Sequence, residues 1–114
     1  MATVAFVLTL VVALLHLLFL YMETLGWDLM ARRFGMNAEK AEITRSLALN
    51  QGFYNGGLAC VLLWALFTGN GATVVAMLIY VIAMAVVGAA SVSPRIFVIQ
   101  GVPAVLALVV TLLA

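Results

Sequence analysis

Hydrophobic positions along the chain fall into four long runs that are separated by shorter polar stretches. The runs cover approximately residues 2–25, 45–67, 72–91 and 94–113. Each run is long enough for an α-helix to cross a hydrocarbon core that is ~30 Å thick. Only a helix satisfies its own backbone hydrogen bonds in lipid. The pattern therefore predicts an all-α integral membrane protein. Residues 1–114 would form a single domain of four transmembrane helices in an antiparallel bundle.

The longest polar segment, residues 26–45, lies between the first two runs and carries seven of the nine charged residues. Its first part places apolar residues such as Trp27 and Phe34 beside the pair Arg32 and Arg33. This mixture is typical of a helix that lies in the headgroup layer. We therefore expect a short interfacial helical segment between the first and second spans.

Local signals predict where the later helices begin and bend. Asn37 suits the N-cap position, so we expect a helix that begins at Ala38 and continues through the second run to about Phe67. Pro94 suits the first position of the fourth helix. Pro103 lies inside that helix and lacks an N–H, so it is expected to cause a kink.

Positively charged residues decide the expected orientation. Four of them lie in residues 26–45, and Arg95 lies in the third connection. The turn at residues 68–71 and both ends of the chain carry no lysine or arginine. Because cytoplasmic loops carry the excess of these residues, we expect the 26–45 loop in the cytoplasm and both termini outside.

Composition supports lipid as the main solvent of the chain. The sequence is 68% hydrophobic and 8% charged, with a mean hydropathy of +1.31. Soluble domains are about 25% charged, and a chain of 114 residues cannot bury so much apolar surface in its own core. The net charge of +1 and the lack of a basic patch give no indication of a nucleic-acid partner.

Polar side chains inside the runs concentrate in the cytoplasmic half and the middle of the predicted bundle. His16 and Glu23 lie on one helix face, ~20° apart around the axis and ~10 Å apart along it. Unpaired polar groups are costly in lipid, so these faces should turn inward. We therefore expect a polar, cytoplasm-facing intramembrane pocket. Its candidate ligand-binding residues are His16, Glu23, Asn50, Gln51, Tyr54, Asn55, Tyr80, Ser91 and Gln100.

Several of these features together resemble one known family. They are the His16…Glu23 spacing, the charged segment after it, the stretch Ala48–Gly56 (ALNQGFYNG) and the polar Gln100 in the last run. The chain resembles the small bacterial membrane-protein family catalogued as domain of unknown function 1304, over nearly its whole length. The Asn-Gln-Gly-x-Tyr-Asn-Gly core is the most specific part. The resemblance implies a multi-pass protein of the bacterial inner (plasma) membrane. It provides no catalytic residues to carry over.

Three functional hypotheses stay open at this point. In the first, the pocket binds a small molecule or a lipid, with transport as one use of that binding. In the second, the protein is a membrane-embedded enzyme of the isomerase or hydratase type, with His16 and Glu23 as acid and base. In the third, it is a structural helix-bundle subunit whose polar residues only join helices. No catalytic residue is assigned beyond these two candidates.

The expected partners follow from the same observations. They are the lipid bilayer and a small-molecule or lipid ligand, together with a homodimer contact through Gly52/Gly56 or Ala85/Ala89. No cofactor is expected, because no nucleotide or nucleophile motif is present. No metal is expected either, because one histidine, one glutamate and a distant cysteine are a poor set of zinc ligands.

Overall fold

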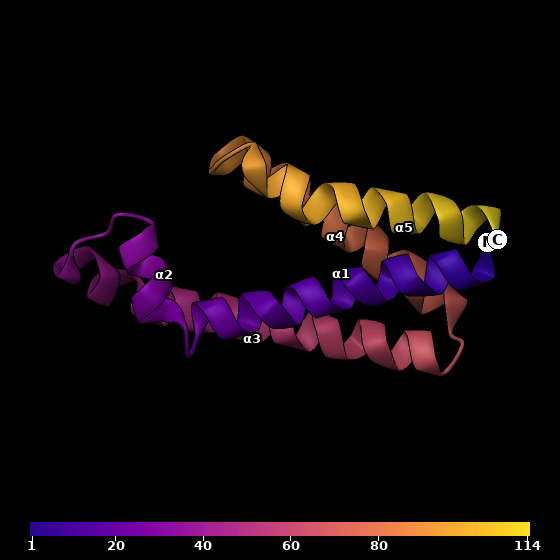
Figure 1. Cartoon of the computed structure of the whole chain (residues 1–114), viewed down its shortest axis with the longest axis horizontal. Helices are drawn as coiled ribbons and strands as arrows, with labels where there is room; N and C mark the ends of the chain where they lie inside the picture. Colours follow the sequence, from indigo (N-terminus) through magenta and orange to yellow (C-terminus); the bar gives the residue numbers. More distant parts are fainter.

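The computed structural model describes residues 1–114 and is entirely helical. The helices are α1 (Ala2–Glu23), α2 (Trp27–Arg33), α3 (Ala38–Phe67), α4 (Gly71–Ser91) and α5 (Val102–Leu113), with a π-helical turn, η1 (Phe97–Gly101), before α5. The chain forms an elongated body of 48 × 26 × 17 Å (Figure 1). α1 packs against α3 and α5, and α4 packs against α3, α5 and η1. The predicted all-α class is confirmed.

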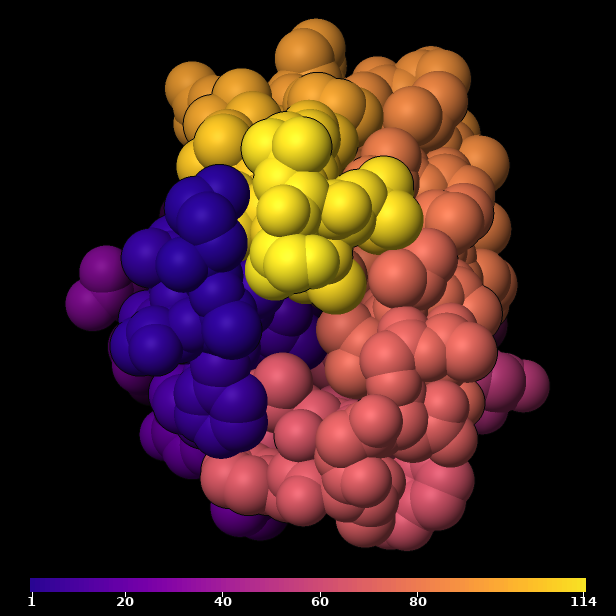
Figure 2. All heavy atoms as spheres, turned by 90° about the vertical axis from the view of Figure 1, so that its right-hand side faces the viewer, coloured from indigo at the N-terminus to yellow at the C-terminus, as the bar shows by residue number.

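The two ends of the body differ in character. α2, the beginning of α3 and the connection from α4 to η1 lie at one end (Figure 1). Both termini and the turn between α3 and α4 lie at the other end, where α1 and α5 meet (Figures 1 and 2). Eight of the nine charged residues belong to the segments at the first end, and the ninth, Glu23, is the last residue of α1, which ends there. We call this the charged end and the opposite one the terminal end.

The boundaries of α3 and α4 follow from their caps. The Asn37 side chain accepts a 2.8 Å hydrogen bond from the backbone N–H of Lys40, at the start of α3. Asn70 accepts one of 3.1 Å from the N–H of Thr73 in the same way, at the start of α4. Such caps satisfy N–H groups that have no partner inside the helix. The predicted start and end of α3 are confirmed.

The fourth hydrophobic run is helical without a break from Arg95 to Leu113, but it contains a π-helical turn where the sequence predicts a kink. It forms η1 first and then α5, which begins at Val102. Pro103 has no N–H with which to bond the carbonyl of Ile99, four residues earlier. The N–H of Val102 instead reaches back to the carbonyl of Phe97. The hydrogen-bonding pattern therefore widens into a π turn, which replaces a simple kink.

Small and aliphatic residues form the core between the long helices. They are Val12, Ala13, Leu62, Ala65, Val74, Leu78, Val81, Ala104 and Ala107. Only 22 of the 114 residues are buried, and large hydrophobic side chains point outward along every long helix. α1 and α4 are each long and apolar enough to cross a membrane. α3 is longer but carries Asn50, Gln51 and Asn55 in its middle part.

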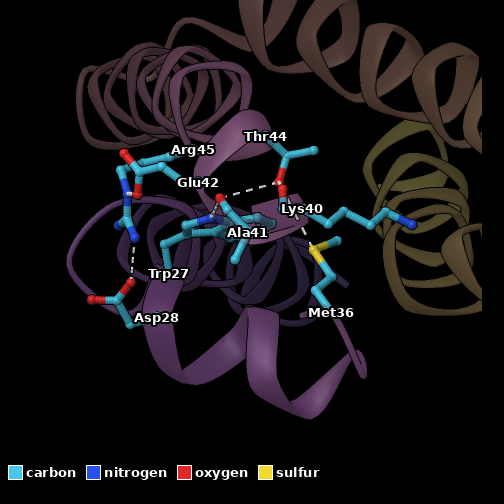
Figure 3. A network of polar contacts seen from close by, with 8 residues as sticks. All are labelled: Trp27, Asp28, Met36, Lys40, Ala41, Glu42, Thr44 and Arg45. Carbon is cyan, nitrogen blue, oxygen red and sulfur yellow. Dashed lines mark hydrogen bonds and ion pairs between the residues drawn. The ribbon is translucent and has the colours of Figure 1, made fainter. Parts of the chain in front are cut away.

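The short helix expected in the polar segment is α2, which packs across the beginning of α3 (Figure 3). The indole N–H of Trp27 donates a 3.1 Å hydrogen bond to the carbonyl of Ala41. The guanidinium of Arg45 pairs with Asp28 of α2 and with Glu42 of its own helix. Trp27 is buried, whereas both ion pairs are exposed. Burial of the indole therefore fixes α2 more firmly than the charges do.

Candidate functional site

α1 and α3 pack closely because two glycines of α3 face α1. A Cβ atom on Gly52 would lie 3.0 Å from Thr24 Cγ2 and 3.1 Å from Glu23 Cβ. A Cβ atom on Gly56 would lie 2.8 Å from a methyl group of Leu20. Both glycines, which are four residues apart, thus pack against α1 of the same chain.

One polar contact crosses this interface. The Asn55 side-chain amide donates a 2.6 Å hydrogen bond to Glu23 Oε1. Asn55 is buried and Glu23 is half-buried. Asn55 lies on the same face of α3 as Gly52 and Gly56, so the close approach of the helices brings the two side chains together. The pair joins two of the residues that the sequence predicts for the site.

His16 is buried on the inner face of α1, two turns before Glu23. Its Nδ1 lies 2.8 Å from the carbonyl oxygen of Val12 in the same helix. A carbonyl oxygen only accepts, so Nδ1 carries the proton and Nε2 remains for another partner. The imidazole also packs edge-on against Phe19, with ring centroids 5.3 Å apart. His16 and Glu23 therefore share a face but engage different partners.

A groove of 440 Å³ lies between α3 and α4. α4 begins beside the end of α3 and ends beside η1, so the two helices diverge from their connecting turn (Figure 1). Apolar residues form most of the groove, with three polar side chains among them: Asn50, Tyr54 and Tyr80. We call this the α3–α4 groove. Its lining consists of Asn50, Phe53, Tyr54, Gly57, Leu58, Val61, Met77 and Tyr80.

The remaining predicted residues lie elsewhere. Gln51 is exposed, and Gln100 is half-buried within η1. Ser91 is exposed and donates a 2.6 Å hydrogen bond to the carbonyl of Val87. The structure thus brings together three of the nine residues in the α3–α4 groove and two more as the Glu23–Asn55 pair. It does not gather all nine around one cavity, because Tyr54 and Asn55 point from different faces of α3.

The apolar part of the groove, from Phe53 and Val61 on α3 to Met77 on α4, is absent from the sequence-based candidates. The spacing of Asn50, Tyr54 and Gly57 already indicates one face of α3. Periodicity does not tell which helix this face meets, so the contribution of Met77 needed the packing of α4.

The second pair of small residues considered for a homodimer, Ala85 and Ala89, belongs to α4, which packs against other helices of the same chain. Ala85 is buried, and the position of a Cβ on the neighbouring Gly88 lies 2.7 Å from Ile96. Gly52, Gly56 and Ala85 thus lie against other parts of the same chain. The homodimer through Gly52/Gly56 or Ala85/Ala89 stays a prediction.

Comparison with known proteins identifies the family. The family described as a protein of unknown function (DUF1304) matches residues 10–112. The chain is also 32% identical over 115 residues to the "Uncharacterized protein YpaA" of Lactococcus lactis subsp. lactis (strain IL1403), covering 96% of this chain and 97% of that protein. No solved structure matches. The resemblance seen in the sequence is confirmed, and the chain belongs to the DUF1304 family.

Proposed function

We propose that this chain is a four-span inner-membrane protein that binds an amphipathic, lipid-like molecule in the α3–α4 groove. The spans are α1, α3, α4 and the η1–α5 unit, which alternate in direction. The charged end faces the cytoplasm, and both termini lie outside. The observation that carries the binding proposal is a trio of polar side chains within an otherwise apolar groove that opens to the side.

The four-span architecture is supported by the distribution of apolar and charged residues. Large hydrophobic side chains point outward along all four spans, where water would make such exposure costly and lipid would not. All the lysines and arginines lie at the charged end. A cytoplasmic location of that end agrees with the distribution of positive charge in membrane proteins.

The composition of the groove determines the class of ligand. Phe53, Val61 and Met77 offer an apolar wall, suited to an alkyl chain. Asn50, one turn before Tyr54, lies nearer the charged end and offers both a donor and an acceptor. A ligand would therefore place its polar end beside Asn50 and its alkyl part along α3 toward Val61. No Asp, Glu, Lys or Arg lines the groove, so the recognised polar group is uncharged, such as an ester or a hydroxyl.

The Glu23–Asn55 pair supports this role from the opposite face of α3. The hydrogen bond fixes the rotation of α3 relative to α1, and the Gly52 contact fixes their separation. Together these contacts direct Asn50 and Tyr54 toward the groove. We therefore assign Glu23 and Asn55 a positioning role.

The other hypotheses have less support from the geometry. An enzyme with His16 and Glu23 as acid and base would need both groups at one substrate, yet they are ~10 Å apart along α1. Each of them also engages its own partner. Transport would be a further use of the same groove. A structural subunit is one of the outcomes that the following experiment distinguishes.

Photo-crosslinking in lipid nanodiscs tests the proposal. A phospholipid that carries a diazirine on one acyl chain would be reconstituted with the protein, and the labelled residues would be mapped by mass spectrometry. We expect labelling to concentrate on residues 53–61 of α3 and around Met77. An excess of the unlabelled phospholipid should compete with it.

Matched tyrosine variants provide the control. Tyr54→Phe and Tyr80→Phe remove a hydroxyl from the groove, whereas Tyr21→Phe removes one from a comparably exposed tyrosine of α1. We expect the groove variants to reduce labelling several-fold and Tyr21→Phe to leave it unchanged. Labelling that is spread evenly over all outward faces and does not respond to these variants would favour a purely structural subunit.

A further inference from the structure

A second recess lies at the terminal end, away from the α3–α4 groove. It has a volume of 330 Å³ and is formed by the first turns of α1, the end of α3, the start of α4 and the end of α5. Figure 2 views this end, where the indigo, yellow and coral segments meet around the recess. Its walls are mainly apolar and include Ala5, Phe6 and Val74. We call this the terminal recess.

Two hydroxyl groups in the terminal recess have no hydrogen-bond partner. They are Oγ1 of Thr9 on α1 and Oγ1 of Thr111 on α5. Thr9 is 1% exposed, and Thr9 and Thr111 both belong to the lining of the recess, with their hydroxyl oxygens buried in its wall. Buried polar atoms nearly always have a partner, so a pair of unpartnered hydroxyls at one cavity requires an explanation.

Four other hydroxyl residues, in helices or at helix ends, behave differently. Thr24, Thr44, Thr68 and Ser91 each donate to the backbone carbonyl four residues earlier, at 2.6–2.8 Å. That carbonyl is the usual partner of a helical hydroxyl. Thr9 and Thr111 do not use it, although both lie in helices. Both hydroxyls therefore keep an unused donor and acceptor in the wall of the recess.

We propose that the terminal recess is a binding site for a small uncharged molecule with one hydroxyl or carbonyl group and an apolar body. Thr9 and Thr111 would bind the polar group, since each hydroxyl can both donate and accept. The apolar wall at Phe6 and Val74 would contact the rest of the molecule. The recess contains no Asp, Glu, Lys, Arg or His side chain, which excludes recognition of a charge by a side chain.

The volume of the recess distinguishes this ligand from a single trapped water. A water molecule takes up about 30 Å³ in the liquid, which is much less than the recess volume of 330 Å³. Water alone would leave the apolar wall without apolar contacts, whereas an alkane would leave both hydroxyls without a hydrogen-bond partner. An amphipathic molecule such as a medium-chain alcohol satisfies both.

Fluorine NMR with a terminally fluorinated hexanol as the probe tests the site on the purified full-length chain in mild detergent. We expect saturable broadening of the probe signal and a rise in the unfolding temperature of the protein. The fluorinated hexane of the same length controls for the polar group and should bind about tenfold more weakly. Equal binding of the alkane would identify the recess as a purely apolar cavity and overturn the proposal.

The variants Thr9→Val and Thr111→Val remove the hydroxyls and keep the shape. Thr68→Val is the matched control, because its hydroxyl lies at the same end but donates to the carbonyl of Trp64. We expect Thr9→Val and Thr111→Val each to weaken the saturable binding by up to about tenfold and Thr68→Val to leave it unchanged.

The unfolding temperature provides a second readout that does not depend on the probe signal. If no ligand uses the hydroxyls, Thr9→Val and Thr111→Val should stabilise the protein, because each removes an unpartnered buried group. That stabilisation, with no response of the unaltered protein to the alcohol, would overturn the proposal. Loss of the alcohol-induced rise in both variants would support it.

Discussion

Glu23 at the end of α1 and Asn55 in the middle of α3 share a 2.6 Å hydrogen bond, although they are 32 residues apart in the sequence. No other hydrogen bond between side chains joins α1 to α3. It lies beside Gly52 and Gly56, where α1 and α3 pack closely. Polar pairing and close approach therefore coincide at one level of the molecule.

A double-mutant cycle on Glu23 and Asn55 measures this contact. We expect Glu23→Ala and Asn55→Ala each to lower the free energy of unfolding by about 1–2 kcal/mol, with a coupling of about 1 kcal/mol between them. Reversible unfolding in mixed detergent micelles provides the measurement. Gln51→Ala, which removes an exposed amide from the same helix, should have little effect. Strictly additive single effects would show that the hydrogen bond does not form.

Because α1 and α3 pack closely, substitution of two different glycines of α3 should change the stability of the protein by different amounts. There is no room for the leucine side chain of Gly52→Leu. Its Cβ alone would lie 3.0 Å from Thr24 Cγ2 and 3.1 Å from Glu23 Cβ, which is closer than ordinary van der Waals contact. Gly57→Leu has nothing within 4 Å of that position. We expect Gly52→Leu to destabilise the protein by about 2 kcal/mol or more, and Gly57→Leu by much less. Circular-dichroism melts of the two variants check this, and similar losses would argue against the α1–α3 packing.

The attachment of α2 to α3 is expected to depend on Trp27 more than on charge. Trp27→Leu removes a buried indole and its hydrogen bond to Ala41. We expect faster hydrogen–deuterium exchange of the α2 backbone amides, while protection in the middle of α3 persists. Asp28→Asn weakens only an exposed ion pair and should change stability by less than about 1 kcal/mol. The prediction fails if Asp28→Asn releases α2 as readily as Trp27→Leu.

Thiol labelling in intact cells tests the proposed orientation. The chain has one cysteine, so Cys60→Ser provides a background without thiols. We expect Ala72→Cys, near the α3–α4 turn, to react with a membrane-impermeant maleimide from outside. Ala38→Cys and Ser93→Cys, at the charged end, should react only after the cells are opened. The reverse pattern would place the charged end outside.

Much of the fold could be predicted because its signals are local. Asn37 caps α3, and the lengths of the apolar runs indicate the lengths of the helices. The polar segment contained one short helix, as its composition indicated. The π turn at Phe97–Gly101 is the exception. Its cause, Pro103, is visible in the sequence, but the response of the backbone depends on how the surrounding helices pack.

The candidate site could be predicted only in part. The periodicity of α1 correctly places His16 on its buried face. The same argument treats all polar faces as walls of one pocket. Glu23 and Asn55 instead pair at the α1–α3 interface, while Asn50 and Tyr54 lie in the α3–α4 groove. Helical spacing identifies the residues that share a face, but it does not identify the helix that this face meets.

The sequence by itself determined the helical class, the positions of the helices, the family and the concentration of charge at one end. These properties follow from run length, caps and motifs, which act over a few residues. Only the tertiary structure decided which polar groups meet, which glycines allow close approach, and that Thr9 and Thr111 share one recess. Those outcomes depend on the rotation and tilt of whole helices, which are set by packing between residues far apart in the chain.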